Sequence, residues 1–181
     1  MNLSFQQPGA WIWLRPGIWK ESFKVQNLSG LCGEPYMTPE INEIITLQKA
    51  LELCRYFSLD YLINRIESDP KKYKDWKFDG CSGLPDKVMG FFTGCDWKDI
   101  TYKCCLPHDL CYAYGDPGNK IERKQADDNF YNNLVTRAGM KKWGAAAFLA
   151  AVRIGGTEEF GLSFSWGFAL KTHFLTPKTR R

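Results

Sequence analysis

Hydrophobic residues recur at helical spacing in the first half of the chain. An apolar stripe follows Thr38-Pro39, and its members are Ile41, Ile44, Ile45, Leu47, Leu51 and Cys54. Because threonine is a good N-cap and proline suits the first turn, the pattern predicts a helix that opens at Thr38-Pro39. A second helix is expected over residues 59–66, and it should stop before Asp69-Pro70.

The second half of the chain shows a helical segment, followed by a segment in which large and small residues alternate. Residues 141–154 are rich in alanine and end before Gly155-Gly156, which predicts a helix. Large residues then alternate with small ones, at Phe160, Leu162, Phe164, Trp166, Phe168 and Leu170. This alternation predicts a strand, for which the Trp11/Trp13 alternation near the N-terminus is a possible partner. The chain is therefore expected to be mainly α-helical, with a small β element from its termini.

The richest chemistry lies in residues 104–112, which read Cys-Cys-Leu-Pro-His-Asp-Leu-Cys-Tyr. On a helix, one face would carry Cys104, His108, Cys111 and Tyr112. Asp109 would turn onto the adjoining face, so His108 suits a general base for water and Asp109 an oxygen ligand for a hard cation. Because Pro107 removes a backbone donor, the helix should begin near Leu106 or bend just before His108.

Other chemistries fit these residues less well. A disulfide-stapled helix with a structural histidine is the plain alternative. A zinc site of Cys105, His108 and Cys111 lacks a second Cys-x-x-Cys pair that would complete a tetrahedral set. Serine hydrolase chemistry has no support, because no Gly-x-Ser-x-Gly elbow occurs in the chain.

A further helix, predicted over residues 126–134, carries an acid on its apolar face. The apolar members of that face are Phe130, Tyr131 and Leu134. Asp127 lies on the same face at helical spacing, whereas Asp128 projects toward solvent. Since a carboxylate on a buried face needs a partner, Asp127 is a candidate functional residue, unless both acids are ordinary residues of a helix N-terminus.

Residues 78–86 form a loop punctuated by glycine and proline, with no helical or strand period. Calcium takes about six to eight oxygen ligands and accepts backbone carbonyls. A loop of this kind with one or two carboxylates is therefore a plausible calcium site, which Asp109 would close. Taken alone, the loop is weak evidence for a calcium site, because Asp-Gly pairs usually form ordinary turns.

These segments together resemble the phospholipase A2 superfamily. The family signature Cys-Cys-x-x-His-Asp-x-Cys-Tyr is met at every fixed position of residues 104–112, and residues 79–81 look like the short Asp-x-Cys loop of its bacterial and fungal branch. The resemblance implies a core of two antiparallel, disulfide-linked helices. It also implies a disulfide between Cys81 and Cys105. The family partner of Cys111 would fall at Ala126, which cannot form a disulfide.

The resemblance also implies a set of catalytic roles. His108 would be the base that activates water. Asp127, with Asp128 as the reserve candidate, would accept a hydrogen bond from the histidine and fix its tautomer. Tyr112, one helical turn after His108, would donate a hydrogen bond to the same carboxylate.

The implied cofactor is Ca²⁺, held by the side chain of Asp79, the carbonyl of Gly80 and the carboxylate of Asp109. The implied activity is calcium-dependent hydrolysis of the sn-2 ester of glycerophospholipids at a membrane surface. Two alternatives stay open, namely a catalytically silent lipid- or receptor-binding protein of the same fold, and a toxin or effector domain exported by a non-classical route. Residues 78–181 would form the catalytic domain, and residues 1–77 an N-terminal extension packed on it in one compact unit.

Composition agrees with a secreted hydrolase without singling one out. A chain of 181 residues that is 44% hydrophobic suits one domain with a sizeable core. Seven cysteines indicate an oxidising compartment, and their odd number leaves at least one without a partner in the chain. Residues 1–20 lack the features of a secretory signal, so we expect a mature form or another export route. No apolar run reaches the roughly eighteen residues of a membrane span.

Charge is concentrated at one end of the chain. Residues 137–181 hold eight Lys or Arg against two Glu, so they carry +6 and the remainder −2 of the total of +4. A basic end beside aromatic residues favours anionic phospholipid surfaces, although a solvated face is the default interpretation. No nucleic-acid recognition motif accompanies this charge, so nucleic acid is not an expected partner.

Overall fold

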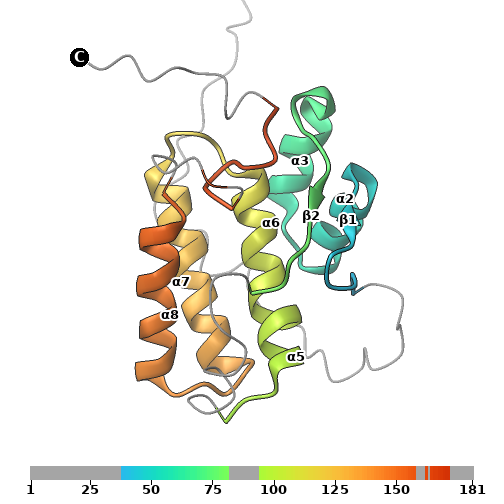
Figure 1. The fold of residues 1–181 in the computed structure, drawn as a ribbon. Coiled ribbons are helices and arrows are strands. Elements are labelled where there is room, and N and C mark those ends of the chain that lie inside the picture. The colour runs from blue at the N-terminus through green and yellow to red at the C-terminus, as the bar shows by residue number, and fades with distance from the viewer. Residues whose placement is uncertain (1–37, 82–93, 158–161, 163, 172–181) are drawn as a thin grey trace, which may run out of the picture. The chain divides into compact units, whose positions relative to one another are not determined.

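Helices make up most of the chain that the computed structural model describes, which is residues 38–81, 94–157, 162 and 164–171. All of these belong to one compact unit, Tyr36–Arg181. The helices in Figure 1 are α2 (Leu47–Tyr56), α3 (Asp60–Ser68), α5 (Trp97–Asp99), α6 (Leu106–Tyr114), α7 (Lys120–Thr136) and α8 (Lys142–Gly155), with a short 3-10 helix, η2, at Pro70–Lys72. The mainly helical class is confirmed, as are the helices expected over 59–66 and 141–154.

A two-stranded antiparallel sheet replaces the start of the first predicted helix. Strands β1 (Ile44–Ile45) and β2 (Trp76–Lys77) pair Ile44 with Lys77 and Ile45 with Trp76. The prediction of a helix from Thr38-Pro39 was therefore wrong. The helix begins at Leu47, because the Thr46 side chain caps it by accepting a hydrogen bond of 3.3 Å from the backbone N–H of Lys49.

The predicted strand over residues 160–170 is also wrong over residues 164–169, although Leu170 forms a single antiparallel β-bridge with Tyr73. Residues 164–169 form turns, with Gly167 in the left-handed region at φ +77°. Ser165, Trp166 and Ala169 are all fully buried, which an alternating strand face does not allow. The segment docks on the end of α6 instead, where Gly167 N–H donates to the carbonyl of Tyr112 at 2.7 Å. Trp11 and Trp13, its expected partners, lie outside the described residues.

The chain is helical for ten residues before Pro107. A π-helix, η3 (Ile100–Cys105), follows α5 directly and leads into α6 at Leu106. The backbone N–H of Leu106 bonds to the carbonyl of Thr101, five residues back, so the hydrogen-bond ladder is offset before Pro107 enters it. Pro107 then sits in the first turn of α6, where its missing donor costs little. The α-helix thus starts at Leu106, as expected, but it continues a helical path that begins at Trp97.

Helix α6 lies at the centre of the packing. It packs against α2 and α3 on one side and against α7 on the other, and α7 packs against α8 (Figure 1). Helices α6 and α7 run antiparallel, as do α7 and α8. One group of core residues joins α6 to α2, α3 and residues 166–170, and another joins η3 to α7 and α8. Residues on both sides of position 77 share this core, and the division into residues 1–77 and 78–181 stays a prediction.

Candidate active site

A buried histidine and a buried carboxylate meet between α6 and α7. His108 Nε2 lies 3.2 Å from Asp127 Oδ1, and the two side chains are 7% and 2% exposed. An ionised carboxylate only accepts hydrogen bonds, so in the neutral ring Nε2 carries the proton and Nδ1 keeps its lone pair. The arrangement gives His108 one nitrogen that is held and one that is able to accept a proton.

Tyr112 completes the support of this carboxylate. Its hydroxyl donates to Asp127 Oδ1 at 2.7 Å. Burial and the neighbouring Asp127 raise the pKa of Tyr112 above its usual range, so the hydroxyl stays a donor near neutral pH. The imidazole itself stacks against aromatic rings, with centroids 4.3 Å from Tyr112 and 4.6 Å from Phe130. These contacts fix the plane of the ring.

The neighbouring acid, Asp128, lies on the outer side of α7. Its carboxylate accepts hydrogen bonds of 2.6 Å from Lys124 Nζ and 2.6 Å from Arg153 Nη2, and its side chain is 41% exposed. The two aspartates therefore have separate partners. Asp127 contacts His108 and Tyr112, whereas Asp128 forms surface ion pairs.

A cavity of about 270 Å³ opens beside the histidine, close to the lower end of the roughly 300–1,000 Å³ of small-molecule sites. Its polar wall includes Gly80, His108 and Asp109. Its apolar wall includes Phe130 of α7, Phe148 and Val152 of α8, and Phe164. An apolar pocket with one basic nitrogen and one carboxylate at its wall suits a ligand that has both an apolar part and a polar, reactive part.

Asp109 is a half-buried carboxylate without a hydrogen bond to a described residue. Burial, and to a lesser extent the charge of Asp79, raise the pKa of Asp109 well above its ordinary value. Asp79 is itself exposed and does not line the cavity, although its carboxylate is near enough to act on Asp109. Two acids in this relation, beside backbone carbonyls, are the hard oxygen donors that Ca²⁺ prefers.

Together with Cys81, Gly80 of the loop lines the cavity. It has φ +77°, and a Cβ there would lie 3.0 Å from Ile41 Cδ1, so a larger residue would strain the backbone and would have to displace the end of the Ile41 side chain. Residues 82–86 of the predicted calcium loop lie outside the described residues. Within the described part of the chain, no cluster of three or more His, Cys, Asp or Glu side chains could hold a metal. Calcium binding by Asp79, Gly80 and Asp109 stays a prediction.

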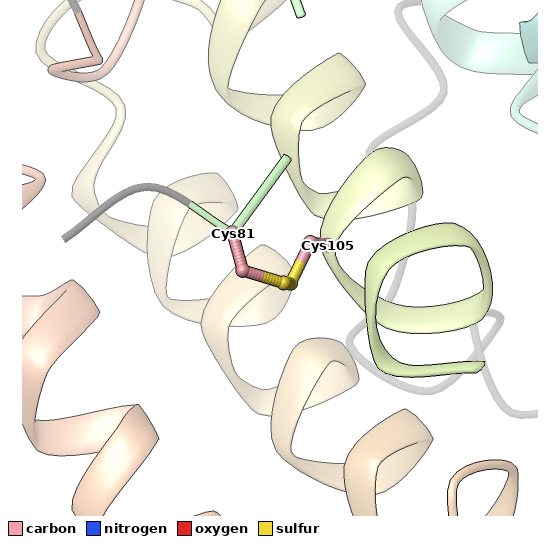
Figure 2. The surroundings of a disulfide bond; sticks show 2 residues. All are labelled: Cys81 and Cys105. Carbon is pink, nitrogen blue, oxygen red and sulfur yellow. A yellow bond between two sulfur atoms is a disulfide. The ribbon is translucent and has the colours of Figure 1, made fainter. Parts of the chain in front are cut away.

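A disulfide fastens this loop to η3, the π-helix that leads into the helix of the histidine. Cys81 bonds Cys105 with a Cα–Cα distance of 5.6 Å, as predicted (Figure 2). The expected disulfide link between the two antiparallel helices was wrong, since the described residues contain none between α6 and α7. Cys111 of α6 is a free, buried thiol, and Tyr61 Oη donates a hydrogen bond to its sulfur at 3.3 Å.

Two residues near the site were missed by the sequence analysis. Arg153 of α8 places Nε 3.9 Å from Asp127 Oδ2. Gly156, just after α8, lies against the Tyr112 ring, and a Cβ there would approach both Tyr112 Oη and the Val152 carbonyl at 2.7 Å. Neither residue belongs to a local motif, because Arg153 reaches the site through the packing of α8 against α7, and Gly156 through its contact with Tyr112.

Two further observations bear on what the protein is. None of the helices in the described ranges is long and apolar enough to cross a bilayer. Among known proteins, no family model, no curated protein and no solved structure matches this chain.

Proposed function

We propose that the protein is a calcium-dependent phospholipase A2, which hydrolyses the sn-2 ester of glycerophospholipids. The observation that carries this proposal is the orientation of His108. Its Nε2 is held by Asp127, its Nδ1 is left to accept a proton, and the ring forms part of the wall of a largely apolar cavity. The motif resemblance in residues 104–112 and the bond between Cys81 and Cys105 add support.

The side chains account for the proton movements of an ester hydrolysis. As water attacks the ester carbonyl, Nδ1 of His108 takes a proton from it, and the ring becomes an imidazolium. Asp127 stabilises that positive charge through Nε2, and Tyr112 keeps the carboxylate in place. The imidazolium then returns the proton to the leaving alcohol oxygen. Attack by water directly on the ester requires no covalent intermediate with the enzyme.

Asp79, Gly80 and Asp109 would hold the calcium ion. When bound, a divalent cation polarises an ester carbonyl and offsets the negative charge that develops on its oxygen. The charges of the two acids give a second argument for a cation at this position. Burial and the charge of Asp79 disfavour the ionisation of Asp109, and a cation between the two carboxylates would relieve that repulsion.

The cavity and its surroundings support the proposed substrate class. The aromatic and aliphatic wall suits an acyl chain, and Leu162, Phe164 and Ile154 expose 40%, 42% and 67% of their surface close to the C-terminal end of α8. With the +6 charge of residues 137–181, these side chains favour peripheral contact with an anionic phospholipid surface. Secretion into an oxidising compartment belongs to the same proposal.

The direct test is hydrolysis of mixed phospholipid vesicles whose sn-2 chains carry a label. We expect release of the labelled fatty acid with calcium and none with excess chelator. His108→Gln should lower kcat by about 10²–10⁴-fold, the usual contribution of a general base. His173→Gln, which removes the other histidine of the chain, is the matched control and should have little effect. Full activity in chelator would reject the mechanism, and calcium binding without hydrolysis would favour the silent lipid-binding alternative.

The metal site has its own test. Asp109→Asn removes one carboxylate oxygen ligand, so calcium affinity measured by calorimetry should fall at least tenfold. The free energy of unfolding without calcium should rise or stay unchanged, because an amide in this half-buried position avoids the cost that burial and Asp79 impose on the charged acid. Unaltered calcium affinity in this variant would place the metal elsewhere.

A further inference from the structure

A series of charges of alternating sign runs from the protein surface to the buried histidine. Lys124 Nζ lies 2.6 Å from Asp128 Oδ2, and Asp128 Oδ1 lies 2.6 Å from Arg153 Nη2. Arg153 Nε lies 3.9 Å from Asp127 Oδ2, and Asp127 Oδ1 faces His108 Nε2. One guanidinium group of α8 therefore spans both aspartates of α7.

We propose that Arg153 is a positioning residue for His108, acting through the carboxylate of Asp127. The inference rests on the proposed function, in which His108 is the base. Arg153 lies outside the cavity wall, so it acts on the reaction through Asp127 and not by contact with the substrate.

The two oxygens of Asp127 have different partners. Oδ1 accepts hydrogen bonds from Tyr112 and His108, and Oδ2 is the oxygen that Arg153 approaches. Rotation about the Cβ–Cγ bond of an aspartate is broad, so contacts at both oxygens set the plane of the carboxylate. If only Oδ1 had partners, the carboxylate could turn while keeping one of its hydrogen bonds. The hydrogen bond from His108 Nε2 would then weaken.

Arg153 also balances the charge of a carboxylate whose side chain is 2% exposed. A buried carboxylate is costly unless it is paired, and a general base carries no positive charge before it takes a proton. The charged or titratable groups that the described residues bring to Asp127 are His108 and Tyr112 from α6, Asp128 from α7 and Arg153 from α8, and the charge of Arg123 of α7 acts on Tyr112. Among the residues that the structure describes, Arg153 is the cation that forms an ion pair with Asp127, and Asp128 fixes its position.

The distance sets the size of the effect. At 3.9 Å the contact is an ion pair and not a hydrogen bond, and the Arg153 side chain is 42% exposed. An ion pair of this kind is weakly stabilising, so we expect a loss in kcat of about fivefold for Arg153→Gln. KM should change less than about twofold, since the substrate does not touch the side chain.

A readout that does not depend on turnover is the tautomer of His108. The chain has two histidines, so the His173→Gln background leaves His108 as its sole imidazole. In protein labelled with ¹⁵N-histidine, at about pH 8.5, where a typical imidazole is neutral, nitrogen shifts report which ring nitrogen carries hydrogen. We expect the Nε2–H form with Arg153, a mixture of both tautomers in Arg153→Gln, and recovery of the Nε2–H form in Arg153→Lys.

Two further variants serve as controls. Arg55→Gln removes an exposed arginine that pairs with Glu67 at 3.0 Å, far from the site in sequence, and should change neither tautomer nor kcat. Asp128→Asn removes the carboxylate that fixes the position of Arg153. It should therefore produce some of the second tautomer, but less than Arg153→Gln does. This variant provides the test if Arg153→Gln folds poorly.

The outcomes separate this inference from the proposed function. If the parent protein hydrolyses no phospholipid but Arg153→Gln still mixes the tautomers, the proposed function fails and the positioning role stands. An unchanged tautomer and unchanged kcat in Arg153→Gln would overturn the positioning role while leaving the phospholipase proposal intact. A change in KM alone would also overturn it, because that result indicates substrate contact.

Discussion

Exchanging each aspartate of α7 for asparagine tests the site most sharply, because the two changes are chemically identical and adjacent. Asp127→Asn replaces the acceptor of hydrogen bonds from His108 Nε2 at 3.2 Å and Tyr112 Oη at 2.7 Å. A hydrogen bond to a charged group contributes about 1.5–3 kcal/mol. Loss of both would cost about 3–6 kcal/mol, which is about 10²–10⁴-fold if it falls on kcat.

Asp128→Asn removes a smaller stabilisation. Its partners, Lys124 and Arg153, lie at a surface where the aspartate is 41% exposed. Ion pairs of this type contribute about 0.2–1 kcal/mol each, and only the pair with Arg153 leads on to Asp127, so kcat should fall less than about tenfold. The ratio of the two losses is therefore expected to exceed about tenfold.

The assay is release of labelled sn-2 fatty acid from mixed vesicles in saturating calcium, with kcat and KM determined for each variant. Urea unfolding of both variants, without substrate, shows whether any loss reflects a smaller folded fraction. Equal losses in kcat for two equally stable variants would refute the assignment of Asp127. A greater loss for Asp128→Asn would show that α7 is rotated so that Asp128, and not Asp127, faces the histidine.

Two other substitutions follow from the packing and the cross-link. Gly156→Ala would place a Cβ against Tyr112, displacing its hydroxyl from Asp127, so hydrolysis should fall at least tenfold. In the matched control Gly144→Ala, the nearest atom is Met140 Cγ at 3.4 Å, so activity should persist and urea unfolding should show a gain of up to about 1 kcal/mol from helix propensity. Cys105→Ser opens a cross-link between residues 24 apart, which should lower the free energy of unfolding in urea by about 3 kcal/mol; an unchanged urea midpoint would contradict this.

The parts that the sequence predicted correctly depend on helical periodicity. The 3.6-residue repeat brings His108 and Tyr112 onto one face of α6, and the same repeat turns Asp127 inward on α7. Because these relations are local within each helix, they can be read from one segment at a time. The meeting of the two helices was a separate expectation, which came from the motif resemblance.

The errors have a different origin. Ile44 and Ile45 fit a helical stripe, but β-branched neighbours suit a strand equally well, and pairing with Trp76 and Lys77 decides between them. Residues 160–170 alternate in size without forming a strand over their described part, because Trp166 inserts beside Gly115 and its indole donates to the carbonyl of Asp116 at 2.7 Å. Both outcomes depend on residues tens of positions away.

Arg153 shows the same limit at the site. In the sequence it is one of eight basic residues after position 136, and nothing local distinguishes it. Its relation to Asp127 and Asp128 arises from the side-by-side packing of α7 and α8 (Figure 1). Ion pairs between two helices depend on how the helices are rotated and shifted along their axes relative to each other. The periodicity within one helix does not determine either quantity.

The π-helix ahead of Pro107 has a consequence for how this chain should be aligned with others. Hydrogen bonds that reach back five residues accommodate one residue more than an α-helical path of the same course, so Ile100–Cys105 is equivalent to a single-residue insertion. A related protein with an unbroken α-helix there should need a one-residue gap within residues 100–103, upstream of the cysteines. Because the π-helix absorbs the extra residue, such a deletion keeps the course of the helix before the gap, and it leaves His108, Asp109 and Tyr112 in register with one another. The segment before the histidine is therefore where length variation between relatives is expected, and the segment after it is where none is expected.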